Sequence, residues 1–154
     1  MKIGIFVHSQ TGNTMSVAEK IKEKYIKNGD SVYMEKIDPV GGENMNETNI
    51  LNINFASIPD LKAYDRVIIC GPVRAFSISP VLNSFLNKVA GLNGQKVELF
   101  VTQTLSQKWM GGNHAISQMK AICVKNGATV EKTAIVNWKN KNRESVISEI
   151  TTTF

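Results

Sequence analysis

Residues 2–14 read KIGIFVHSQTGNT, a short apolar run followed by a polar loop. The run at 2–7 is almost continuously apolar and too short for a typical helix, which favours a parallel strand covered on both faces. Apolar residues then recur at helical spacing, at Val17, Ala18, Ile21 and Tyr25. This stretch therefore predicts a β-strand that leads through a loop at 8–14 into an amphipathic α-helix, which Asn28 and Gly29 should end.

The same alternation continues along the chain. Strands are predicted at 31–38, 66–70, 96–102 and 129–138, and helices at 80–89, 113–125 and 143–150. Ser79 followed by Pro80 is a good start for the first of these helices, since a hydroxyl caps it and proline suits its first turn. Residues 39–63 predict a loop with a short irregular helix. Such alternation indicates an α/β fold, a parallel sheet with helices on both faces.

The totals set limits on the class of protein. At 154 residues the chain is expected to form one domain, residues 1–154. No apolar run reaches the roughly 18–20 residues that span a bilayer, and the first residues lack the pattern of a signal peptide. Cys70 and Cys123 have neither metal-site nor disulfide-framework spacing, so we expect a cytoplasmic protein. The net charge is +5, but the lysines are scattered, and we expect neither a nucleic-acid nor a membrane partner.

The loop at 8–14 is rich in donors and holds no Lys or Arg. A helix N-terminus offers unpaired N–H groups to an anion, three hydroxyls add donors, and Gly12 lets the backbone approach a ligand closely. The loop lacks the Gly-Lys-Ser/Thr ending of triphosphate-binding loops, and the chain has no Gly-x-Gly-x-x-Gly pattern. One terminal phosphate monoester fits this loop best. An ordinary polar turn between strand and helix is the alternative.

Two segments carry a family resemblance. Ser9-Gln10-Thr11-Gly12-Asn13-Thr14 resembles the FMN phosphate loop of flavodoxins, Ser/Thr-x-Thr-Gly-x-Thr, and residues 63–72, AYDRVIICGP, resemble the third strand of that family. The last strand is uninterrupted, as in the short-chain type. The resemblance implies a flavodoxin-like three-layer sandwich, a five-stranded parallel sheet in the order 2-1-3-4-5.

The resemblance also implies FMN as the cofactor and a set of residues around it. The phosphate would lie at Ser9, Gln10, Thr11, Gly12, Asn13 and Thr14. The flavin ring would lie between two loops, made of Pro72, Val73, Arg74, Ala75, Phe76 and Ser77, and of Thr102, Gln103, Thr104 and Leu105. Phe76 and Trp109 are the candidates for stacking on the ring. The alternative for Phe76 is packing against the helix that follows it, and the alternative for Trp109 is a partly exposed anchor of its loop. The family often has a tyrosine directly after its fourth strand, where this chain has Thr102 to Leu105.

Other polar and aromatic residues have less specific interpretations. His8 either helps to orient the phosphate or is a polar residue at a strand end. His114 is expected to occupy an ordinary position in the first turn of a helix, and Trp138 to pack at the end of the last strand. We expect no metal site and no catalytic side chain.

The charges near the expected ring depart from the family. Flavodoxins are typically acidic, whereas 72–79 and 102–113 contain no Asp or Glu and do contain Arg74 and Lys108. Cations beside an anionic reduced flavin favour the reduced form. A stabilisation of about 1–2 kcal/mol would raise the second reduction potential by about 40–90 mV. We therefore expect a flavin less strongly reducing than that of a typical flavodoxin.

These features favour an electron-transfer flavoprotein that exchanges electrons with a redox partner protein. The alternative is an FMN-dependent NAD(P)H oxidoreductase that reduces quinones or similar acceptors, because the same fold supports both classes and Arg74 and Lys108 suit the phosphates of NAD(P)H. A domain that no longer binds FMN also stays open. A phosphate-accepting receiver domain of this topology needs aspartates at its strand ends, and the sequence lacks them after Val7 and Cys70.

Overall fold

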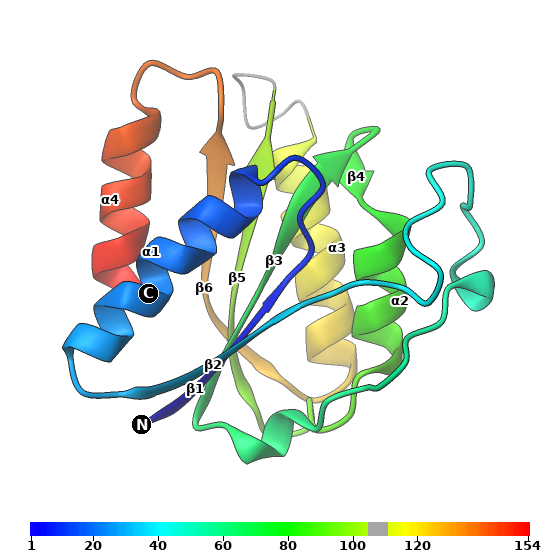
Figure 1. Cartoon of the computed structure of the whole chain (residues 1–154), viewed down its shortest axis with the longest axis horizontal. Coiled ribbons are helices and arrows are strands. Elements are labelled where there is room, and N and C mark those ends of the chain that lie inside the picture. The colour runs from blue at the N-terminus through cyan, green and yellow to red at the C-terminus, as the bar shows by residue number, and fades with distance from the viewer. Residues whose placement is uncertain (105–110) are drawn as a thin grey trace.

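The computed structural model describes residues 1–104 and 111–154. Helices and strands alternate along these residues (Figure 1), in the order β1 (Lys2–Val7), α1 (Asn13–Lys27), β2 (Ser31–Lys36), the short 3₁₀ helices η1 (Ile50–Asn52) and η2 (Leu61–Ala63), β3 (Arg66–Arg74), β4 (Ser77–Ile78), α2 (Pro80–Lys88), β5 (Lys96–Gln103), α3 (Gly112–Lys125), β6 (Thr129–Asn137) and α4 (Arg143–Thr153). Strands β2, β1, β3, β5 and β6 lie side by side in that order, and all their pairings are parallel. This order confirms the predicted topology. The additional two-residue strand β4 pairs antiparallel with β3.

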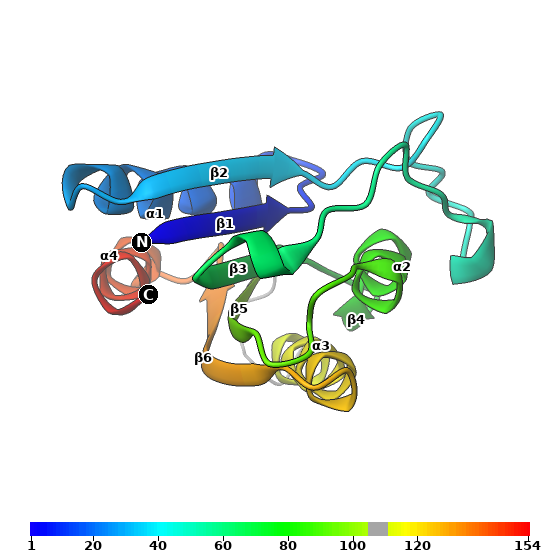
Figure 2. The same cartoon turned by 90° about the horizontal axis from the view of Figure 1, so that it is seen from below.

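The sheet separates two layers of helices (Figure 2). Helices α1 and α4 cover one face over a core that includes Ile5, Ile21, Phe100 and Ile147. The other face is covered by α2 and α3, with Phe6, Leu82, Leu99 and Met119 in its core. Strand β1 is buried from Ile3 to Val7, and this burial on both faces explains its unbroken apolar run.

The predicted helix signals at Ser79 and Asn28 are confirmed. The Ser79 hydroxyl accepts a hydrogen bond from the backbone N–H of Leu82 at 3.1 Å and caps α2. Asn28 ends α1, and Gly29 follows it with a φ of 88°. Helix α4 continues to Thr153, three residues beyond the predicted end at 150.

The segment between β2 and β3 contains no α-helix, only η1 and η2. The side chains of Asn49 and Asp60 accept hydrogen bonds from the backbone of Leu51 and Lys62, and each starts one of these short turns. The backbone of Val40 donates to Asn54 at 2.7 Å, so the segment folds back on itself. Its asparagine-rich sequence provides local side-chain hydrogen bonds that compete with a longer helix.

A charged residue lies inside the sheet layer. Glu98, in β5, is fully buried, and one of its oxygens forms an ion pair with Arg66 of β3. Arg66 also pairs with Glu131 of β6 at 3.2 Å. The other oxygen of Glu98 has no hydrogen-bond partner among the described residues. Burial raises the pKa of this carboxyl, and Arg66 opposes the rise.

The carboxyl ends of the strands form the upper edge of the sheet in Figure 1. From β1 the chain passes outward to β2 and then returns to β3 on the other side of β1. This reversal makes the space beside the ends of β1 and β3 a topological switch point, where open α/β sheets bind ligands. Within the described residues, no helix is both long and apolar enough to cross a membrane.

Candidate functional site

The predicted phosphate loop connects β1 to α1 at this switch point. Gly12 is the residue before the helix and has a left-handed φ of 91°. The Ser9 hydroxyl oxygen accepts hydrogen bonds from the backbone N–H groups of Gly12 at 3.2 Å and Met15 at 3.3 Å. Ser9 therefore closes the loop onto the helix, and its own hydroxyl proton is still available for donation.

The first turn of α1 keeps free donors. Among the described residues, no acceptor is found for the backbone N–H groups of Asn13 and Thr14. Gln10 and Thr11 are exposed beside them. Unpaired N–H groups and the helix dipole favour an anion at this place. The loop thus has the donor set that a phosphate monoester requires.

A buried hydroxyl pair fixes this loop to the sheet. The Oγ1 atoms of Thr14 and Thr102 are 2.7 Å apart, and both residues are almost completely buried. Thr102 lies near the end of β5, so the pair joins the phosphate loop to the second predicted ring loop. The structure therefore places the Thr102 hydroxyl directly against the loop at 8–14.

The first predicted ring loop is a β-hairpin. Val73 pairs with Ile78 and Arg74 with Ser77, which leaves Ala75 and Phe76 as a two-residue turn. Both turn residues have positive φ, 48° and 64°, as in type I′ turns that usually contain Asn or Gly. Phe76 is 60% exposed, so its ring is accessible at the hairpin tip.

The hairpin tip also packs tightly against the start of α3. Gly111, the residue before α3, has a φ of 112°. A Cβ atom at this position would lie 2.7 Å from Phe76 Cα and 2.7 Å from Val73 Cγ1. Only glycine allows this backbone approach.

Arg74 is not the unopposed cation that the sequence predicted. Its Nη1 lies 3.2 Å from Oε1 of Glu43, and its Nη2 donates to the backbone oxygen of Met45. Glu43 comes from the segment between β2 and η1, outside the loops whose charges were compared in the sequence. The prediction of an uncompensated positive charge at Arg74 is therefore wrong, because the Glu43 carboxylate compensates this charge. Lys108 lies outside the described residues.

Glu43 also contacts the predicted phosphate loop. Its Oε1 accepts from Gln10 Nε2 at 2.9 Å, and its Oε2 lies 3.1 Å from His8 Nε2. Burial alone would raise the pKa of Glu43, but the hydrogen bonds from Gln10 and His8 and the positive charge of Arg74 hold this pKa below its usual value. Glu43 is thus a fixed anion at neutral pH.

His8 is buried between Glu43 and Ser79. Its Nδ1 lies 2.7 Å from the Ser79 hydroxyl oxygen. Burial lowers the pKa of His8 more than Glu43 raises it, so the imidazole is neutral at pH 7. A carboxylate only accepts, so Nε2 carries the proton and donates to Glu43, and Nδ1 accepts from Ser79. His8 therefore orients the Glu43 carboxylate through its Nε2–H.

The second predicted ring loop is described only at its start. The side chain of Gln103 donates to Asn137 of β6, and the backbone oxygen of Gln103 accepts from the N–H of Trp138 at 2.7 Å. Thr104 is exposed. Leu105 and Trp109 lie outside the described residues, so their predicted places beside the ring stay predictions.

The other residues noted in the sequence have structural positions. Pro72 is paired with Thr102 in the sheet, and the Ser77 hydroxyl donates to backbone oxygens of its own hairpin. His114 is exposed in the first turn of α3. Trp138 stacks against the Arg143 guanidinium at 4.6 Å, as a packing residue would.

Neither cysteine has the environment of a reactive thiol. Cys70 and Cys123 are free and buried, and burial raises both pKa values, that of Cys123 to about 12. Within residues 1–104 and 111–154, no group of three or more His, Cys, Asp or Glu residues is arranged to hold a metal ion.

Known structures share this fold. Flavodoxin 2 from Bacillus cereus has a TM-score of 0.66 at 18% identity, over 99% of this chain and 96% of its own. Two-electron reduced flavodoxin from Megasphaera elsdenii has a TM-score of 0.62 at 21% identity, over 99% of both chains. Flavodoxin from Fusobacterium nucleatum, bound to flavin mononucleotide, has a TM-score of 0.64 at 14% identity, over 98% of this chain and 95% of its own. The fold is that of the flavodoxins.

The sequence itself gives no comparable match. No family model matches the chain, and a comparison with curated proteins found no match either. The likeness to flavodoxins therefore consists of the fold, and the function must be argued from the site.

Glu43 is the residue at this site that the sequence did not predict. It lies in a segment without helix or strand periodicity, 31 residues from Arg74 and 33 from Gln10 along the chain. No motif includes it, and only the folded chain brings it to the switch point.

Proposed function

We propose that this chain binds FMN and acts as an electron-transfer flavoprotein. The phosphate would be held by the loop at 9–14, with the Asn13 and Thr14 N–H groups and the hydroxyls of Ser9, Thr11 and Thr14 as donors. Bound FMN would supply the redox chemistry, so the protein needs no catalytic acid or base. The chain's own part is to bind the cofactor, orient it and limit its contact with water.

One observation carries this proposal. The first turn of α1 has N–H groups without an acceptor in the described part of the chain, behind a left-handed glycine and at the switch point of a flavodoxin fold. Dianionic phosphate matches such a donor set without a cation, whereas a triphosphate normally requires a lysine.

The ring would lie between the hairpin at 72–77 and the loop that begins at Thr102. Phe76 is the candidate for stacking from the hairpin, and its exposed side chain in a strained turn supports that role. Trp109 and Leu105 are proposed from the sequence alone.

The engaged side chain of Arg74 favours the carrier over the NAD(P)H oxidoreductase. A reductase of this size needs cations for the phosphates of NAD(P)H, and Arg74 was a candidate. Arg74 instead binds Glu43 and the Met45 backbone. The proposed partner is therefore a redox protein, and the proposed compartment is the cytoplasm, where buried free cysteines such as Cys70 and Cys123 stay reduced.

Cofactor titration tests the proposal directly. Apoprotein titrated with FMN should bind one equivalent and quench its fluorescence, and riboflavin, which lacks the phosphate, should bind far more weakly. Anaerobic NAD(P)H alone should leave the bound flavin oxidised, whereas NAD(P)H together with a separate reductase, or dithionite, should bleach it. Rapid bleaching by NAD(P)H alone would support the oxidoreductase instead. Failure to bind FMN would contradict both functions.

A further inference from the structure

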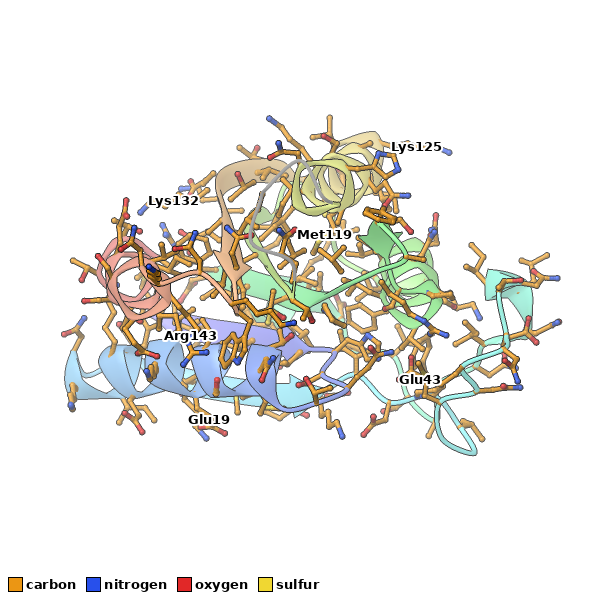
Figure 3. All side chains as sticks on the ribbon, turned by 90° about the horizontal axis from the view of Figure 1, so that it is seen from above. Glu19, Glu43, Met119, Lys125, Lys132 and Arg143 are labelled. Atoms are coloured by element: carbon orange, nitrogen blue, oxygen red, sulfur yellow. The ribbon has the colours of Figure 1, made fainter. Side chains whose placement is uncertain are left out.

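The Glu43 carboxylate connects three parts of the site that are distant in sequence. Oε1 contacts Gln10 of the phosphate loop at 2.9 Å and Arg74 of the hairpin at 3.2 Å, and Oε2 contacts His8 at 3.1 Å. The Glu43 side chain is 19% exposed. Figure 3, which looks onto the carboxyl-terminal edge of the sheet, shows Glu43 on the loop segment that follows β2.

A second set of contacts holds the same segment to both loops. Arg74 donates to the Met45 backbone oxygen, and Gln10 Nε2 lies 3.6 Å from Met45 Sδ. The hairpin and the phosphate loop are therefore both attached to residues 43–45. Residues 43–45 therefore connect the two loops through side-chain contacts.

The other end of this network is buried. His8 is 1% exposed, and its Nδ1 accepts from the Ser79 hydroxyl, whose oxygen also caps α2. The hydrogen bonds thus run from the start of α2 through Ser79 and His8 to Glu43. Each member of this network has a defined partner, so Glu43 has one favoured position.

The neighbouring carboxylate does not share this role. Glu47 accepts hydrogen bonds from the Asn49 N–H at 2.8 Å and Asn52 Nδ2 at 3.2 Å, both within its own segment. Glu47 therefore carries the same charge on the same segment without touching either loop, and it provides a matched control.

We propose that Glu43 is a positioning residue for the cofactor loops, which holds the phosphate loop and the hairpin in their binding arrangement before the ligand arrives. This inference rests on the proposed function, because the ligand it serves is FMN. Its physical basis is preorganisation: loops that are already ordered lose less conformational freedom on binding. Glu43→Gln keeps the shape but removes the charge, and its amide NH₂ opposes donors of His8, Gln10 or Arg74.

Hydrogen exchange in the apoprotein tests the positioning without the cofactor. Glu43→Gln should speed exchange in peptides that cover 9–14 and 72–78, and Glu47→Gln should leave both near the wild-type rate. Equal exchange in wild type and Glu43→Gln, or an equal increase in both variants, would overturn the inference. This outcome is independent of FMN, so it is distinguishable from a failure of the proposed function.

FMN titration gives the second readout. Suppose that Glu43→Gln reduces the fraction of apoprotein with both loops in the binding arrangement to about a tenth. The dissociation constant for FMN then rises about tenfold, because the apparent affinity is proportional to that fraction. Glu47→Gln should bind as the wild type does. Arg74→Gln should weaken FMN binding less in the Glu43→Gln variant than in the wild type, because the two side chains act through one shared contact. Strictly additive effects on the dissociation constant would contradict this coupling.

Discussion

The buried hydroxyl pair of Thr14 and Thr102 leads to a prediction about stability and binding. Their oxygens are 2.7 Å apart, and the residues are 1% and 4% exposed. Changing either threonine to valine leaves the other hydroxyl buried without this partner, which costs about 1–3 kcal/mol of unfolding free energy. Changing both removes both polar groups at nearly constant shape, a replacement that is often close to neutral. The double variant should therefore be more stable than either single variant.

Urea denaturation of the four apoproteins measures this coupling through the midpoint and the extrapolated free energy of unfolding. The double variant is expected to be about 1–3 kcal/mol more stable than either single variant, a non-additive result. FMN affinity should not recover with stability, because Thr14→Val removes a proposed phosphate donor in both backgrounds. Additive losses of stability would refute the exclusive pairing of the two hydroxyls. Full FMN affinity in the double variant would refute the role of Thr14 in phosphate binding.

Three further predictions concern charge, backbone and thiols. Arg66→Met leaves Glu98 buried without its counter-ion and should cost about 3 kcal/mol at pH 7 in urea denaturation. This loss of unfolding free energy should be smaller near pH 4, where Glu98 becomes protonated and needs no counter-ion. Burial raises the folded-state pKa of Glu98, so the protonated carboxyl stabilises the folded state, and that stabilisation is lost as the pH rises through the folded-state pKa. Gly12→Ala has open space for its Cβ but a φ of 91°, so thermal unfolding should report a cost of about 1–2 kcal/mol and FMN titration a weaker complex. Cys70 and Cys123 should resist a thiol reagent at pH 8 in the native protein and react after unfolding, because their pKa values are raised.

The fold was predictable because its signals are local. The apolar run at 2–7, the Ser79 cap and the Asn28-Gly29 ending each depend on neighbours along the chain, and each is found as predicted. The phosphate role of the loop at 8–14 stays a prediction, and it could be made from the sequence because the proposed donors are consecutive residues between a strand and a helix.

The features that could not be predicted from the sequence lack local signals or depend on contacts between distant segments. The positive φ values of Ala75 and Phe76 gave no turn signal, because neither residue is glycine or asparagine. The two-residue strand β4 is too short to show a period. Glu43 reaches Arg74 from an irregular segment, so counting charges within loops could not reveal that Arg74 is paired.

The close contact at Gly111 has a consequence for sequence variation. At Gly12 a new side chain meets open space, so a saturation library should recover Asn or Asp, which adopt positive φ at modest cost. At Gly111 any side chain would collide with the hairpin backbone at Phe76, so the same library should recover glycine alone. A chain with this hairpin therefore tolerates no substitution at Gly111, although this residue has no side chain that could contact a ligand.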